Sequence, residues 1–154
     1  MSPQEFKDLL SPLTAQLAGR NLDTSLQAWL NTEYGPDTAG YQDLRAACLD
    51  GVARGWLCER EGGGLRYGRI FKPTPELQGF SVDVVDMKDI AGPHHGHPLG
   101  EIDLIMPIDE TARFDEHPAG WLVCPPGSAH HPTVTQGRSL VLYLLPQGRI
   151  DFTR

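Results

Sequence analysis

The sequence lacks any hydrophobic run of the length that a membrane span requires. A transmembrane helix needs about 20 consecutive apolar residues, and no stretch of this 154-residue chain approaches that length. The start of the chain also lacks a basic segment followed by an apolar run, so we expect no secretory signal and a cytoplasmic location. Because 40% of the residues are hydrophobic, the chain can fill the core of one compact domain.

Positive charge is scarce and nowhere clustered. The chain has 13 Lys and Arg against 20 Asp and Glu, a formal net charge of -7, and no run of basic residues. Binding to nucleic acid requires clustered positive charge that displaces counterions. We therefore expect neither a nucleic acid nor a membrane as a partner.

Cysteine is equally sparse. The three cysteines, Cys48, Cys58 and Cys124, are an odd number and show no CxxC spacing. This pattern favours neither a disulfide framework nor an all-thiolate zinc site, so we expect buried, reduced thiols.

The first third of the chain has the periodicity of helices. Apolar residues recur at helical spacing from Pro3 to about Leu57, which predicts three short helices. Gly19 is expected to stop the first, Asp23 to cap the second, and Gly51 or Gly55 to lie near the end of the third. We expect residues 1–60 to form a helical N-terminal extension packed on a β domain at residues 61–154.

Strands are predicted after the glycine run at residues 62–64. This run lacks the GxxxxGK[ST] pattern of a phosphate-binding loop and is interpreted as a turn. Short β-branched and alternating segments follow, separated by Gly, Pro and Asp. The spacing is typical of an all-β sandwich or a closed barrel, and we favour the barrel. The expected strands are 65–72, 80–87, 101–107, 112–115, 120–124, 131–135 and 139–145.

All six histidines lie between positions 94 and 131, and part of this group has the spacing of metal ligands. His95 and His97 share one face if they lie on a strand, and a turn at residues 98–100 can return Glu101 to that face. The turn at Pro125–Gly127 would direct His130 inward. Such a set suits Fe(II), Mn(II), Ni(II) or Zn(II), and the ligands alone do not choose among them.

Other residues near these motifs have more open roles. Glu101 is favoured as a metal ligand over a general acid and base. Asp103 follows it at strand spacing and should also point inward, either for proton transfer or for a salt bridge to Arg66, Arg69 or Arg113. The remaining histidines are expected outside the ligand set, near it or at the surface: His94, His117 and His131.

These motifs resemble those of the cupin superfamily. His95, His97 and Glu101 match its HxHxxxE pattern, and the turn before His130 matches PxGxxH. Segments 61–69, 79–85, 91–98, 100–104 and 124–130, with the helical lead-in, resemble the small bacterial 4-hydroxylaminobenzoate lyases. The resemblance implies a mainly β fold, a single cupin-type, jelly-roll-like β-barrel preceded by a short α-helical region. It also implies a divalent metal and conversion of 4-hydroxylaminobenzoate to 3,4-dihydroxybenzoate and ammonia during 4-nitrobenzoate degradation.

A benzoate substrate implies a cationic partner for its carboxylate. Arg69 is the candidate anchor, with Tyr67 on the same face of its strand and Tyr143 as a further pocket residue. Cupin-like barrels with a helical extension often pair, so we expect a homodimer.

Two other functions remain open at this point. The same ligand set would serve an Fe(II) dioxygenase or an isomerase of another small aromatic or organic acid. It would also fit a non-catalytic small-molecule-binding cupin. Oxygen uptake separates the dioxygenase from the lyase.

Overall fold

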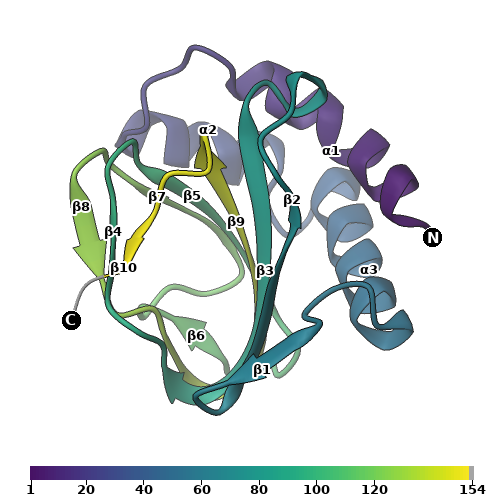
Figure 1. Ribbon diagram of the computed structural model, residues 1–154, viewed down its shortest axis with the longest axis vertical. Coiled ribbons are helices and arrows are strands. Elements are labelled where there is room, and N and C mark those ends of the chain that lie inside the picture. The colour runs from purple at the N-terminus through teal and green to yellow at the C-terminus, as the bar shows by residue number, and fades with distance from the viewer. Residues whose placement is uncertain (153–154) are drawn as a thin grey trace.

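The computed structural model describes residues 1–152 as a mainly β molecule with its helices in the first third of the chain (Figure 1). The helices are α1 (Pro3–Leu17), α2 (Thr24–Glu33) and α3 (Ala39–Arg54), so the three predicted helices are confirmed. Within the described residues, none of the helices combines the length and the apolar character needed to cross a membrane.

The helix ends use the capping residues that the sequence offers. The side chain of Asp23 accepts a hydrogen bond from the Leu26 amide at 3.0 Å and caps α2. Gly55 ends α3 in the left-handed conformation, with φ of 86°. The predictions for these two residues are confirmed, whereas α1 ends at Leu17, two residues before Gly19.

The strands form two antiparallel sheets. The large sheet has the order β1-β2-β3-β9-β5-β7, with β6 paired to β9, and the small sheet has the order β10-β4-β8. A short 3-10 turn, η1, lies at Pro75–Leu77. The strands of the large sheet are β1 (Arg60–Gly62), β2 (Leu65–Phe71), β3 (Phe80–Ala91), β5 (Glu101–Pro107), β6 (Arg113–Phe114), β7 (Gly120–Cys124) and β9 (Thr133–Pro146), and those of the small sheet are β4 (His95–His97), β8 (Ser128–His130) and β10 (Asp151–Phe152).

The mainly β fold with a helical N-terminal region is confirmed, but its strands do not close into one continuous barrel within residues 1–152. The two separate sheets form a β-sandwich instead. The strand expected at 131–135 is wrong at its start, because His131 lies between β8 and β9. β9 instead runs unbroken for 14 residues. β1, β4, β8 and β10 were not predicted, since two or three residues are too few to show alternation.

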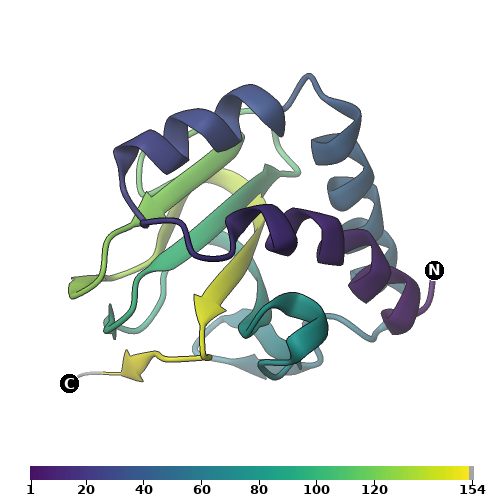
Figure 2. The same cartoon turned by 90° about the horizontal axis from the view of Figure 1, so that it is seen from above.

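The two faces of the large sheet are covered differently. The three helices lie against one face (Figure 2), and the small sheet and β6 lie toward the other. On the helix side the strands supply a continuous apolar layer, formed by Val82, Val84, Ile102, Leu104, Leu140, Leu142 and Leu144. The face toward the small sheet, here called the inner face, carries a smaller apolar group that includes Val85, Ile105, Val141 and Tyr143. The three cysteines are buried and free, as expected.

Candidate metal centre

Two short strands of the small sheet bring three imidazoles together. In the antiparallel pairing of β4 with β8, His95 lies opposite His130 and His97 lies opposite Ser128. Residues opposite one another in a sheet point to the same face. The three histidine rings consequently have centroids 4.7 to 4.8 Å apart.

A tight turn brings a carboxylate from the other sheet to these rings. The Gly100 amide donates to the His97 carbonyl at 3.1 Å, and Gly100 has φ of 90°. A Cβ atom at this position would lie 2.9 Å from the Cys124 carbonyl oxygen, so the turn requires glycine. Glu101 then begins β5 with no exposed surface, and the site joins the two sheets.

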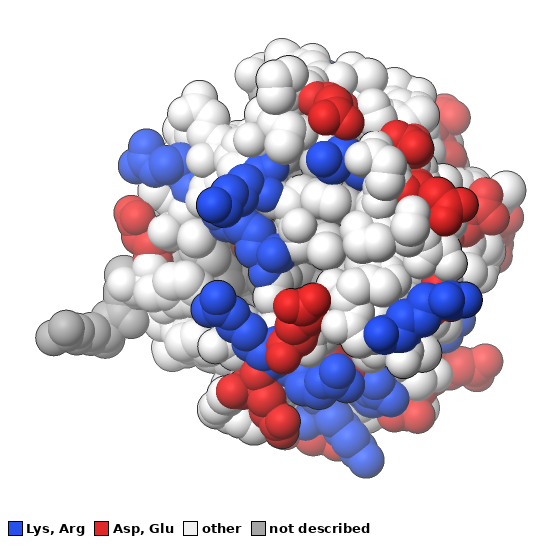
Figure 3. Space-filling view, turned by 45° about the vertical axis from the view of Figure 1, so that its right-hand side comes forward, with Lys and Arg blue, Asp and Glu red and all other residues white. Residues whose placement is uncertain are grey.

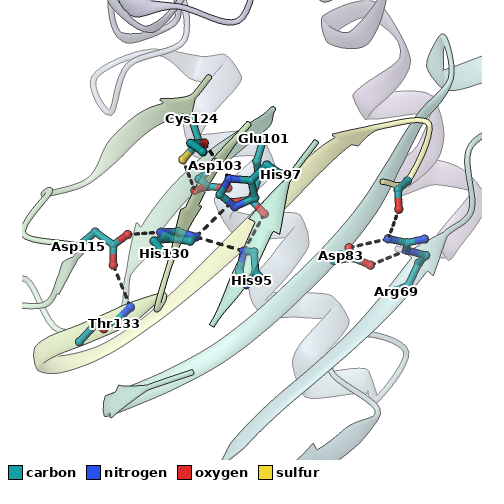
Figure 4. Close-up of polar contacts among 12 residues, drawn as sticks. Arg69, Asp83, His95, His97, Glu101, Asp103, Asp115, Cys124, His130 and Thr133 are labelled. Atoms are coloured by element: carbon teal, nitrogen blue, oxygen red, sulfur yellow. Dashed lines mark hydrogen bonds and ion pairs between the residues drawn. The ribbon is translucent and has the colours of Figure 1, made fainter. Parts of the chain in front are cut away.

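The four predicted metal ligands meet at one point, as Figure 4 shows. The Nε2 atoms of His95, His97 and His130 lie 3.5, 3.1 and 3.6 Å from the Glu101 carboxylate oxygens. Nε2 of His130 lies 3.1 Å from Nε2 of His95. We refer to these four residues as the four-residue cluster.

The donor atoms of the cluster fit a single divalent ion. Nε2 of His97 and both oxygens of Glu101 are buried and have no hydrogen-bond partner among the described residues. Leaving buried polar atoms unsatisfied is costly. Donors about 2.1 Å from one ion lie roughly 3.0 to 3.4 Å from one another, close to the spacings found here. A bound cation would satisfy all three atoms at once.

The charge states within the cluster also favour a cation. Burial opposes ionisation of Glu101, but its contacts with His130, His95, His97 and Asp103 outweigh it and hold the pKa of this carboxyl well below its usual range. For His130, burial lowers the pKa, but contacts with Asp115 and Glu101 outweigh it and raise the pKa to about 9. In the absence of a metal, a proton on His130 would thus supply the positive charge that Glu101 requires.

Asp103 and Tyr143 lie beside the cluster on the inner face. Asp103 is fully buried, and the Cys124 thiol donates to its Oδ2 at 3.8 Å. Burial, followed by the nearby charge of Glu101, raises the pKa of the Asp103 carboxyl well above its usual value. Oδ1 of Asp103 and the Tyr143 hydroxyl are both buried and without a partner among the described residues. The two side chains lie opposite each other across β5 and β9.

The salt bridge considered for Asp103 is not formed with any of the three arginines. Arg69 binds Asp83 instead, with Nε and Nη2 donating to its two carboxylate oxygens at 2.8 and 3.2 Å. Arg113 donates to the backbone carbonyls of Glu110 and Ala112. Asp103 thus keeps a buried carboxyl with no basic side chain paired to it among the described residues.

Arg69 lies on the inner face but apart from the cluster (Figure 4). Across neighbouring strands, Arg69 lies opposite Asp83, Asp83 opposite Tyr143, and Tyr143 opposite Asp103. These four side chains therefore form one row across β2, β3, β9 and β5. Tyr67 is 38% exposed at the outer part of β2. The structure thus brings Tyr143 next to the cluster, leaves Arg69 at the rim of the same face, and keeps Tyr67 at the surface.

Access to the cluster is restricted. His95, His97 and Glu101 are at most 2% exposed, whereas the side chain of His130 is 17% exposed. The His130 side is therefore the accessible side of the cluster.

A hollow of about 630 Å³ lies elsewhere, between α3, β2 and β9. In space-filling view, several Lys and Arg side chains border a hollow on one face of the molecule, despite the acidic composition (Figure 3).

The other histidines lie outside the four-residue cluster. The His94 and His131 rings contact each other, with centroids 4.8 Å apart. His117 lies in the turn after β6, where its amide donates to the Phe114 carbonyl.

Sequence reasoning missed Asp115, Ser128 and Asp83. Asp115 contacts His130, Ser128 contacts His97, and Asp83 holds Arg69. Ser128 could have been found from its place two residues before His130, which puts both side chains on one face of a strand. Asp115 carries no such signal, because only the folding of β6 against β9 brings it to His130.

Solved structures with some likeness to the chain include two proteins from Ralstonia eutropha JMP134. One, described as having a cupin-like fold and unknown function, is 23% identical, covers 59% of this chain and 60% of its own, and has a TM-score of 0.42. The other, described as an RmlC-like cupin protein, is 14% identical, covers 60% of this chain and 62% of its own, and has a TM-score of 0.44.

Sequence comparisons cover nearly the whole chain. The family model described as PnbB, 4-hydroxylaminobenzoate lyase, matches residues 8–152. A 4-hydroxylaminobenzoate lyase of Pseudomonas putida is 33% identical over 165 residues, which cover 96% of this chain and 94% of that protein. One of Nocardioides sp. (strain LMS-CY) is 34% identical over 160 residues, which cover 98% of this chain and 95% of that protein.

Proposed function

Since the chain belongs to the 4-hydroxylaminobenzoate lyase family, we propose that it converts 4-hydroxylaminobenzoate to 3,4-dihydroxybenzoate and ammonia. We propose further that a divalent metal ion held by the four-residue cluster takes part. The observation that carries this proposal is a buried set of donor atoms on His97 and Glu101 that have no partner in the described part of the chain, in a lyase of this family. Fe(II), Mn(II), Zn(II) and Ni(II) all suit the donor set.

The proposed reaction balances with water as the only co-reactant. The N–O bond breaks and its electron pair leaves on oxygen. Water adds to the neighbouring ring carbon, and a second water displaces the nitrogen as ammonia. One molecule of water is consumed overall, the nitrogen is reduced by two electrons, and the ring is oxidised by two. The reaction therefore requires no external oxidant.

The metal would supply Lewis acidity, which stabilises the departing oxygen and lowers the pKa of a coordinated water. Glu101 is proposed as a ligand, because contacts with its neighbours favour its ionised form at neutral pH. A permanently ionised Glu101 is a poor proton donor. The acid and base role therefore passes to a neighbouring group.

Asp103 is proposed as that group. Burial raises its pKa and so favours the protonated form of the carboxyl, and Oδ1 has no competing partner among the described residues. A neutral carboxyl in a buried site can donate a proton to a departing nitrogen or oxygen. The Tyr143 hydroxyl lies opposite Asp103, also lacks a partner in residues 1–152, and is proposed to bind the substrate.

Arg69 is proposed to bind the substrate carboxylate. Its position in the same row as Asp103 and Tyr143 supports this role. Asp83 fixes the guanidinium through Nε and Nη2, and Gly148 adds a carbonyl contact to Nη2 at 3.3 Å. A guanidinium held in this way loses little conformational entropy when it binds an anion. Tyr67, an aromatic residue on the outer part of the same strand, is proposed to contact the substrate as well.

Turnover under anaerobic conditions tests the proposed function. The purified protein, loaded in turn with each of the four candidate metals, is mixed with 4-hydroxylaminobenzoate in the absence of oxygen. We expect ammonia and 3,4-dihydroxybenzoate in equal amounts with at least one metal. Turnover that requires oxygen would identify a dioxygenase instead, and no turnover with any of the metals would overturn the proposal.

Three further expectations complete the proposal: a role in 4-nitrobenzoate degradation, a cytoplasmic location and a homodimer. Size-exclusion chromatography with light scattering tests the last. We expect twice the 16.9 kDa mass of one chain, and a mass near 17 kDa would overturn the dimer.

A further inference from the structure

Asp115 lies in a turn whose backbone is unusual for its sequence. Phe114 and His117 pair through two backbone hydrogen bonds of 2.8 and 2.9 Å, leaving Asp115 and Glu116 as the two central residues. Their φ angles are 47° and 70°. Two-residue turns of this kind favour Gly or Asn, and side chains in the left-handed region cost about 1 kcal/mol or more. Backbone strain of this kind often marks a functional position.

The turn directs the Asp115 carboxylate at one of the cluster histidines. The Asp115 amide donates to the Thr133 carbonyl at 2.8 Å, and the Thr133 amide donates to Asp115 Oδ1 at 2.9 Å. Thr133 thus fixes both the backbone and one carboxylate oxygen. The other oxygen, Oδ2, lies 2.5 Å from Nδ1 of His130 (Figure 4).

This contact determines which nitrogen of His130 carries hydrogen. An ionised carboxylate only accepts hydrogen bonds, so Nδ1 must donate. In the neutral imidazole the lone pair then resides on Nε2, the nitrogen that faces His95 and Glu101. Between the two neutral tautomers of His130, Asp115 thus favours the one whose Nε2 can bind a cation.

Ser128 acts on His97 in a similar way, without a charge. Its hydroxyl donates to the Pro125 carbonyl at 2.6 Å, which uses its one hydrogen. The same oxygen lies 3.0 Å from Nδ1 of His97 and must therefore accept from it. The lone pair of His97 again resides on Nε2, which faces Glu101.

We propose that Asp115 and Ser128 are positioning residues that fix the orientation and tautomer of His130 and His97, and so set the affinity of the cluster for metal. The proposal rests on the metal site of the proposed function. It extends that site by two residues that touch neither the metal nor the substrate. Hydrogen bonds to the outer nitrogen of a histidine ligand commonly change metal affinity by about 10- to 100-fold.

Metal affinity of purified variants tests this proposal without any activity assay. Binding of Co²⁺ to the metal-free full chain is followed by calorimetry and by the visible absorption of the bound ion. In Asp115→Asn, the amide either loses its contact with the Thr133 amide or turns a donor toward His130. We expect a Kd for Co²⁺ raised about 10- to 100-fold, with an altered absorption spectrum.

Two further variants calibrate that result. Glu116→Gln removes the same charge at the next residue, which is exposed, and should leave the Kd within twofold of that of the wild type. Ser128→Ala removes a neutral hydrogen bond and should raise the Kd roughly three- to tenfold. An effect of Glu116→Gln as large as that of Asp115→Asn would overturn the proposal in favour of long-range charge.

A Co²⁺ affinity of Asp115→Asn within twofold of the wild-type value would also overturn the proposal. If Asp115→Asn loses Co²⁺ affinity and its metal-free form also loses thermal stability, Asp115→Glu distinguishes the two causes, because it retains a carboxylate. Co²⁺ affinity recovered in Asp115→Glu supports positioning of His130, and a loss of affinity equal to that of Asp115→Asn overturns it. A wild-type chain that binds no Co²⁺ would overturn the metal site itself, whereas a metal-binding chain without lyase activity would leave this inference standing.

Discussion

The two faces of the large sheet are both buried, yet they differ in chemistry. Along β5, Ile102 and Leu104 face the helices, while Glu101 and Asp103 point to the inner face, and all four have no exposed surface. Apolar side chains gain free energy from such burial, whereas carboxylates lose it unless they find partners. Burial alone therefore does not distinguish the core from the site. The two are distinguished by where buried polar atoms lack hydrogen-bond partners.

Among the described residues, buried polar atoms without hydrogen-bond partners are concentrated on one side of the large sheet. The buried polar atoms without a partner among the described residues belong to His97, Glu101, Asp103 and Tyr143, with the single exception of Nε1 of Trp56. The helix face supplies stability, and the inner face holds groups that a metal and a substrate can satisfy. Changes on the two faces should therefore have separable effects.

The largest expected effect is on the inner face. His97→Ala removes one of the buried donor atoms and should abolish stoichiometric metal binding. It should also lower kcat/KM by about a thousandfold or more, because the proposed metal would contribute several kcal/mol of transition-state stabilisation. Metal analysis of the dialysed protein and steady-state kinetics measure the two effects. Retention of one metal per chain would contradict the assignment of this ligand.

The matched change on the helix face is Leu142→Ala. Leu142 is fully buried in the apolar layer, and its truncation should lower the free energy of unfolding by about 3 kcal/mol through lost burial and a cavity. Metal content should remain one per chain. Urea unfolding and metal analysis check this, and loss of the metal in the folded variant would show that the two faces are not separable.

A pH dependence of stability is expected from His130. Contacts with Asp115 and Glu101 raise its pKa to about 9 in the folded, metal-free protein, from 6.5 for an unperturbed histidine, so the folded state binds the proton more tightly. This contribution, about 3 kcal/mol, is fully present below pH 6.5 and is lost as pH rises through about 9. Urea unfolding of the metal-free chain at pH 6 and pH 9.5 measures it. His130→Asn should remove most of the difference, and an equal slope in that variant would assign the effect to another group.

The smallest effect is expected at the rim. Arg69→Ala should raise KM for 4-hydroxylaminobenzoate about tenfold or more with little change in kcat, because its proposed contact is with the carboxylate, away from the reacting atoms. Arg66→Ala is the control, since Arg66 lies opposite Asp86 and outside the row of Arg69, Asp83, Tyr143 and Asp103. An unchanged KM in Arg69→Ala would discard Arg69 as the anchor.

Much of the fold could be predicted from local sequence. The long strands β2, β3 and β5 were found because alternation over seven or more residues is readable, and the cap at Asp23 because its side chain acts on the next turn. The closure of the strands was not predicted correctly. Whether strands form a sandwich or a barrel depends on edge pairings that no local pattern encodes.

In the candidate site, too, some features follow from local sequence and others only from the tertiary structure. The spacing of His95, His97 and Glu101 determined which side chains could share a face, because strand geometry and the turn at Gly100 are local properties. The packing of the small sheet on the large one alone decided that three imidazoles would meet a carboxylate, and that Asp115, distant in sequence from the first motif, would contact His130. Local backbone geometry is encoded residue by residue, whereas contacts between sheets arise only when the whole chain buries its apolar surface.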